Sequence, residues 1–329
     1  MIAALALGIA LTVSSPVPDP VQDPSQNATP PAAAAPVATQ EEPIRLEDVI
    51  ANARRLEDAT EAFVGEVAAP VRRRGYARWH DGVCVGVANL SPEVGQTMID
   101  RISDRARELG LIAGAPGCHP SIVIVATQNA TPFTAEFVAM RPRLFRTGAT
   151  GMDRGRAAFQ RFLETDRPVR WWNVSMPVDS DTGDSAVRMP GQCNATCIGQ
   201  GSAVQYAPNT VIRGTSRIAS QYRQDLKRTF VIIDVDKLNG ATLEQLSDYV
   251  AMVSLAQIDP DADTGAFDTI LNLFDDPSSV SGLTGWDEAY LAGLYEAEWY
   301  RINQDSQIRA IANTIEWKYR DAQAAEEAE

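Results

Sequence analysis

Two histidines and four cysteines are the residues of this chain best suited to metal or redox chemistry. With only His80 and His119 available, any centre that needs three imidazoles is excluded. A zinc site could combine both histidines with Cys84 and Cys118. However, the usual zinc-finger spacings are absent, and the adjacent Cys118 and His119 would chelate one ion poorly. We therefore predict no metal and no cofactor.

The cysteines are even in number, which in an exported chain is typical of two disulfide bonds. Three pairings are possible. Cys193 and Cys197 lie four residues apart in a glycine-rich stretch. Cys84 lies in the first predicted strand and Cys118 just ahead of the second, so the two would be neighbours if these strands are adjacent in the sheet. We predict one disulfide between Cys84 and Cys118 and a second between Cys193 and Cys197.

Three alternating aspartates resemble the start of a calcium-binding loop. Asp259, Asp261 and Asp263 match the first three ligands of a helix-loop-helix calcium site. Position six is Thr264 where that motif has glycine, and position twelve is Ile270 where it has a bidentate glutamate. A solvated acidic turn is therefore the preferred interpretation.

A second acidic pair, Asp234 and Asp236, ends a predicted strand at residues 230–236. Two carboxylates at the end of a strand can act as general acid and base. Neither a histidine to complete a triad nor a G-x-S-x-G elbow accompanies them, and no glycine-rich phosphate loop is present. We therefore do not favour hydrolysis by this pair, and we keep a metal-independent hydrolase that uses groove carboxylates as the alternative function.

The first half of the chain predicts a strand–helix–strand unit. Apolar residues recur at helical spacing over 46–67. A strand at 82–90, a helix that begins after Ser91-Pro92, and a buried strand at 121–127 then follow. Farther on, we expect helices at 134–145 and 153–164 and a long loop at 179–205.

Residues 170–178 alternate in the period-two pattern of a strand that is buried on one face only. Trp171 lies on the other face of this predicted strand, where it could form a platform for a carbohydrate or peptide. A core position is the preferred interpretation, because large aromatic side chains dominate core burial.

The last third is predicted to be mainly helical. The strand at 230–236 precedes a helix at 242–258, for which Thr242 and Gln245 form a capping box. Leu246, Val250 and Val253 should face a core. Three more helices are expected, at 267–274, 284–295 and 303–325.

The N-terminal residues indicate export. Residues 2–13 form an apolar run that suits a secretory signal and is too short to span a membrane, so we assign 1–15 as signal-like. Residues 16–43 are rich in proline and alanine and predict a disordered linker. Residues 44–329 then form a single α+β domain, with a mixed sheet, packed helices and a helical C-terminal cap.

Three stretches of the C-terminal third carry a resemblance: DYVAMVSLAQIDP, ILNLFDD and LTGWDEAYLAGLY. They resemble the end of a bacterial family of exported proteins of unknown function with a zincin-like, metalloprotease-type fold. In that fold a helix carries His-Glu-x-x-His, whose two imidazoles reach one zinc ion. The resemblance implies that Ser247, Asp248 and Ala251 stand at those three positions here, so that the metal site has been lost.

The resulting prediction is a non-catalytic, zincin-like binding or scaffold protein of the cell envelope, periplasmic or secreted. Its partner would be an envelope component or another protein. With 43 acidic and 29 basic residues, the net charge of −14 excludes a fold-wide attraction to nucleic acid. No stable membrane span is expected.

Overall fold

The computed structural model describes residues 46–71, 74–145, 152–187, 220–297 and 303–326. All of them belong to the second of two units into which the chain divides, residues 45–329. The predicted signal-like segment and linker, residues 1–43, lie outside the described residues, as do Cys193 and Cys197.

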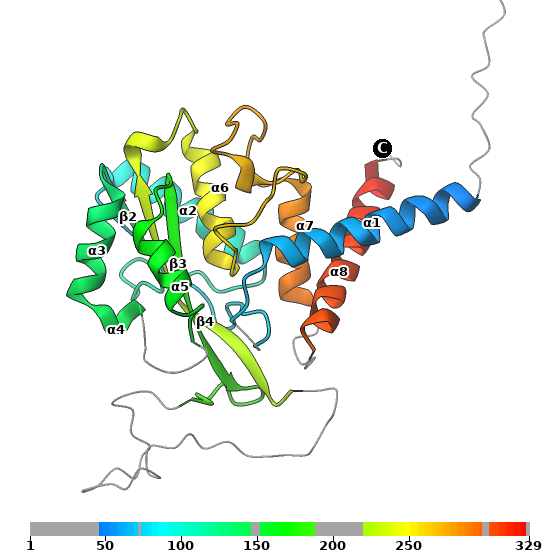
Figure 1. The fold of residues 1–329 in the computed structure, drawn as a ribbon, viewed down its shortest axis with the longest axis horizontal. Coiled ribbons are helices and arrows are strands. Elements are labelled where there is room, and N and C mark those ends of the chain that lie inside the picture. Colours follow the sequence, from blue (N-terminus) through cyan, green and yellow to red (C-terminus); the bar gives the residue numbers. More distant parts are fainter. Residues whose placement is uncertain (1–45, 72–73, 146–151, 188–219, 298–302, 327–329) are drawn as a thin grey trace, which may run out of the picture. The chain divides into compact units, whose positions relative to one another are not determined.

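A four-stranded mixed sheet forms the centre of the fold (Figure 1). Its strands are ordered β1 (Val85–Ala88), β2 (Ile122–Thr127), β4 (Tyr222–Asp234) and β3 (Val169–Asp179). The first three are parallel, and β3 pairs antiparallel with β4 along the edge. The predicted α+β class with a mixed sheet is confirmed.

Helices pack on both faces of the sheet. The larger core lies between one face and five helices: α1 (Leu46–Val67), α2 (Pro92–Glu108), α6 (Leu243–Leu255), α7 (Gly285–Glu296) and α8 (Gln304–Glu326). A second core lies on the opposite face, under α3 (Ala130–Met140), α4 (Pro142–Phe145) and α5 (Arg156–Glu164). Figure 1 shows α6 and α2 against the sheet, with α7, α1 and α8 beyond them.

Local sequence signals define several helix ends. The hydroxyl of Ser91 accepts a hydrogen bond from the first turn of α2, which starts at Pro92. Gly110 follows that helix with a φ of 78°, a left-handed conformation that glycine adopts without steric cost. Thr242 and Gln245 form the predicted capping box of α6. The strand–helix–strand unit is also confirmed, since β1 and β2 are parallel neighbours on either side of α2.

The prediction that residues 170–178 are buried on one face only is wrong. Trp171 packs into the larger core and Trp172 into the second core, so both faces of β3 are buried. The reason is that helix α6, within the larger core, covers the face of Trp171, which the alternation assigned to solvent. The preferred core position of Trp171 is confirmed, with 5% of its surface exposed.

Several element boundaries differ from the prediction. Strand β4 begins at Tyr222 rather than at residue 230, because its first half pairs with β3. The helix expected at 267–274 is only the short 3-10 helix η3 (Ile270–Asn272). The predicted helix at 134–145 is divided into α3 and α4, with Pro142 opening the second.

Candidate functional site

The three positions that the zincin-like resemblance assigns to a lost metal motif lie in the interior. Ser247, Asp248 and Ala251 on α6 each have no exposed surface. Ser247 donates its hydroxyl hydrogen to the carbonyl oxygen of Leu243, one turn back on the same helix. None of these three side chains therefore faces an open groove, because α6 is packed between the sheet and α2 and is buried from Gln245 through Leu255.

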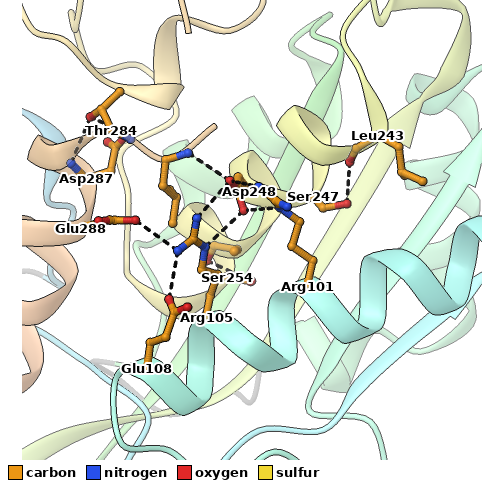
Figure 2. A network of polar contacts seen from close by, with 12 residues as sticks. Arg101, Arg105, Glu108, Leu243, Ser247, Asp248, Ser254, Thr284, Asp287 and Glu288 are labelled. Carbon is orange, nitrogen blue, oxygen red and sulfur yellow. Dashed lines mark hydrogen bonds and ion pairs between the residues drawn. The ribbon is translucent and has the colours of Figure 1, made fainter. Parts of the chain in front are cut away.

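Asp248 is instead the centre of a buried ion-pair network (Figure 2). Arg101 on α2 donates from Nε and Nη2 to its two carboxylate oxygens, at 2.7 Å each, and Arg105 adds longer contacts. The backbone N–H of Leu283 also donates to Oδ2. Burial raises the pKa of Asp248, but the hydrogen bonds from Arg101, Arg105 and Leu283 outweigh it, and the net shift is downward. The network joins α2, α6 and the segment before α7.

Two of the cysteines, considered above as possible zinc ligands, are bonded to each other. Cys84 and Cys118 form a disulfide across 34 residues, as predicted. Their sulfurs cannot then serve as thiolate ligands. Within the described ranges, no group of three or more His, Cys, Asp or Glu side chains could hold a metal ion.

Asp234 and Asp236 do not form the acid–base pair that the strand end suggested. Asp234 is the last residue of β4 and is 1% exposed, whereas Asp236 is exposed on the 3-10 helix that follows. The chain leaves the strand at Asp234, so the two side chains no longer share one side of an extended segment. Asp234 accepts a hydrogen bond from the backbone N–H of Ala130 at the start of α3 and pairs with Lys237 at 3.2 Å.

Two of the three aspartates of the calcium-like turn pair with arginines. Asp259 accepts from Arg154 at 2.6 Å. Asp261 accepts from Arg161 at 2.6 Å and from Arg167 at 2.8 Å. Burial raises the pKa of Asp261, but the hydrogen bonds from these two arginines lower it by more than burial raises it, so the net shift is downward. The turn is therefore neither a simple solvated loop nor a set of free carboxylates.

These arginines line a pocket beside the edge strand β3, which we call the arginine pocket. It opens partly to solvent and has room for about one water molecule. Four arginines contribute to its wall, together with one carboxylate and four largely apolar residues: Arg154, Arg161, Arg167, Arg170, Asp261, Ala158, Phe162, Trp171 and Pro260. The pocket lies between α5, the start of β3 and the turn after α6.

Arg170 differs from the other arginines of the pocket. It is 1% exposed, and its contacts are the carbonyl oxygens of Phe162 and Leu163 and the hydroxyl of Thr131. Its Nε has no hydrogen-bond partner in the described part of the chain. Burial lowers the pKa of Arg170, although Asp166 and Asp234 act in the opposite direction. Burying a guanidinium N–H costs folding free energy unless the N–H donates a hydrogen bond to an acceptor.

The arrangement is chemically suited to holding an anion. Arginine has five N–H donors, and in the described contacts Arg154 and Arg161 each use only one of them with the turn. Guanidinium groups bind carboxylate or phosphate oxygens through paired hydrogen bonds. The pocket thus combines unused donors with an excess of positive charge inside a strongly acidic chain.

Sequence reasoning missed this site, although a signal was present. Residues 154–170 contain five arginines in a chain whose acidic residues outnumber its basic ones by 43 to 29. That local enrichment indicates a basic patch. Whether these arginines form a pocket depends on the turn at Asp261, which is distant in sequence but contacts them in the fold.

Comparison with known protein families, with curated proteins and with solved structures gave no match. Among the described residues, no helix is both long and apolar enough to cross a bilayer.

Proposed function

We propose that this chain is an exported, non-catalytic binding or scaffold protein of the cell envelope, periplasmic or secreted, that holds an anionic group in the arginine pocket. One observation carries the proposal. Arg154 and Arg161 lie at a partly open pocket with side chains that are 19% and 49% exposed, and each uses only one N–H donor in its described contact with Asp259 or Asp261. An anion at the mouth of the pocket would accept from the donors that these contacts leave unused.

Two further observations support export. The disulfide between Cys84 and Cys118 is typical of proteins that fold in an oxidising compartment. The apolar run at 2–13 has the length of a secretory signal core. We keep the zincin-like scaffold, with its metal motif lost, as part of the same proposal.

The alternative of a metal-independent hydrolase has less support. Acid–base hydrolysis needs two carboxylates that face one substrate. Asp234 is buried against the start of α3 and Asp236 is exposed, so this pair does not meet that requirement.

Calorimetric titration of the purified full chain with sodium acetate, phosphate and sulfate tests the proposal. Chloride should keep the ionic strength constant. At least one of the three anions should bind, and Arg161→Gln should weaken that binding about tenfold, since a charge-assisted hydrogen bond is lost. Arg107→Gln is the matched control, because Arg107 is similarly exposed on α2 and pairs with Asp104 away from the pocket.

Two outcomes would overturn the proposal: no binding of any anion, or equal loss of binding in Arg161→Gln and Arg107→Gln. Stoichiometric zinc in protein purified without added metal would contradict the lost metal site. Fractionation of the producing cells tests export, and recovery of the chain with an intact N-terminus in the cytoplasm would contradict it.

A further inference from the structure

Strand β1 forms one edge of the sheet and is only partly buried. In the strand order it has a neighbour, β2, on one side alone. Its first three residues are half-buried and the fourth, Ala88, is exposed. The opposite edge differs, because β3 is buried at every residue but one, and its Ser175 N–H donates to the carbonyl oxygen of Met152 outside the sheet. Of the two edges, β1 is therefore the accessible one.

The backbone groups of β1 point alternately toward β2 and away from it. The carbonyl oxygen of Cys84, directly before the strand, accepts from the N–H of Ile122 on β2 at 3.0 Å. Residues two positions apart point to the same side of a strand, so Gly86 also faces β2. The N–H and C=O groups of Val85 and Val87 then face outward. Within the described ranges, these outward groups have no hydrogen-bond partner.

A segment of the same chain already pairs with this outer side just before the strand. Val83 donates from its N–H to the carbonyl oxygen of Ile112 at 2.9 Å and accepts from the N–H of Gly114 at 2.8 Å, in a parallel bridge. The pairing ends there, because the chain turns at residues 116–117. The outer side therefore accepts an extended backbone at its start and is open along β1 itself.

The unpaired groups specify the kind of partner. Backbone donors and acceptors at the edge of a sheet match those of another extended chain, which can add to the sheet as a further strand. The strand reads VGVA, with no charged residue and no proline. Charges and prolines are the features that commonly protect an exposed edge from such pairing, and β1 has neither.

The charges around β1 favour a basic partner. Residues 79–100, which include β1 and the start of α2, contain Asp81, Glu93 and Asp100, all exposed, and neither lysine nor arginine. The whole chain has a net charge of −14. Attraction between opposite charges therefore favours a basic segment at this edge. A second copy of this chain is disfavoured, because it would bring two acidic surfaces together.

We propose that the outer edge of β1 binds an extended, basic segment of another protein, which pairs with the backbone of Val85 and Val87 and adds a strand to the sheet. This inference is independent of the arginine pocket. It assigns a surface and a partner class to the chain beyond the anion binding proposed above.

Titration calorimetry of the full chain with short blocked peptides tests the inference. A peptide of alternating lysine and valine should bind, and a peptide of alternating glutamate and valine should bind about tenfold more weakly or not at all. Two further versions of the basic peptide carry N-methyl groups on every valine or on every lysine. Only alternate N–H groups of an extended peptide face the edge, so one version should bind like the parent and the other about tenfold more weakly.

A variant of the chain tests the same contact from the other side. Val87→Pro removes an outward N–H and leaves the hydrogen bonds between β1 and β2 in place, so it should weaken binding of the basic peptide about tenfold. Val87→Thr is the matched control, because it retains the N–H and the branched shape, and it should bind like the wild-type chain. Far-ultraviolet circular dichroism checks that both variants are folded.

Several outcomes would overturn the proposal. They are absence of binding by the basic peptide, equal binding of the acidic and basic peptides, and equal affinities of the two N-methylated peptides. Equal affinities of folded Val87→Pro and Val87→Thr would do the same. Dimerisation in sedimentation velocity that Val87→Pro abolishes would assign the edge to a second copy instead. If Val87→Pro does not fold, the pair of N-methylated peptides decides alone.

Discussion

Arg101 on α2 holds the carboxylate of Asp248 on α6 through two parallel hydrogen bonds, each 2.7 Å long (Figure 2). Asp248 has no exposed side-chain surface, whereas Arg101 is about one-third exposed. The pair therefore joins a buried charge to a cation that remains partly hydrated. The resemblance assigns a catalytic motif to α6. In this structure the acidic residue of that motif instead forms an ion pair that joins α6 to α2.

Replacing Asp248 should strongly destabilise the chain. Asp248→Ala leaves Arg101 and Arg105 without their shared acceptor and the Leu283 N–H without a partner. Loss of one partner of a buried ion pair costs about 3 to 5 kcal/mol of unfolding free energy. Urea denaturation measures the loss. Glu108→Ala, which removes an exposed contact of Arg105, is the control and should cost under about 1 kcal/mol.

The contribution of Asp248 should depend on pH. Its pKa is lower in the folded state than the usual value of about 3.9, so its charged form stabilises the fold above that value. The stabilisation is lost as the pH falls through the folded-state pKa. The difference in unfolding free energy between the wild-type chain and Asp248→Asn should be constant from pH 7 to 5 and shrink below about pH 4. A difference that widens in acid would contradict this assignment.

Gly282 should not tolerate a side chain. A Cβ atom at this position would lie 2.6 Å from Oδ2 of Asp248, inside the ion-pair network. Gly282→Ala must displace that carboxylate or the loop, and it should lower the melting temperature by several degrees. Gly285→Ala is the matched control, since no atom lies within 4 Å of its Cβ position and it begins α7. Equal melting temperatures for the two variants would contradict the close packing at Gly282.

The elements were largely predictable because their signals are local. The capping box at Thr242 and Gln245 and the Ser91-Pro92 helix start depend only on neighbouring residues. The disulfide between Cys84 and Cys118 followed from the expected pairing of two strands. The larger errors came from tertiary contacts, such as the packing of α6 on the Trp171 face of β3, which the alternation assigned to solvent.

The candidate site was not predictable, because its parts come from separate segments. Asp261 was interpreted as an ion ligand or a solvated residue, and neither interpretation included Arg161 or Arg167 as its partner. The buried position of Arg170 also could not be inferred, since arginine is almost never fully buried. The interior position of Asp248 conflicts with the groove that its place in the resemblance implied.

Removing the disulfide should lower stability without preventing folding. By the chain-entropy relation, a loop of this length contributes roughly 3 to 4 kcal/mol, so Cys84→Ala with Cys118→Ala should melt several degrees below the wild-type chain. Reductant should have little further effect on that variant unless the predicted bond between Cys193 and Cys197 also forms. An unchanged melting temperature in the double variant would refute a stabilising role for the disulfide between Cys84 and Cys118.

Restoring the metal motif tests whether α6 faces a groove. Ser247→His, Asp248→Glu and Ala251→His would place two imidazoles at positions that have no exposed surface. Overpacking and the burial of unpaired polar groups each cost about 1 to 3 kcal/mol or more, and the longer carboxylate would disturb the pairing with Arg101.

We therefore expect the triple variant to unfold at lower urea concentration than the wild-type chain and to bind no zinc. Glu244→His, an exposed substitution on the same helix, is the control and should leave stability nearly unchanged. A triple variant with wild-type stability that binds zinc stoichiometrically would contradict the buried placement of Ser247 and Ala251. It would instead support the open groove that the zincin-like resemblance implies, because two imidazoles can reach one ion only where that face of the helix is accessible.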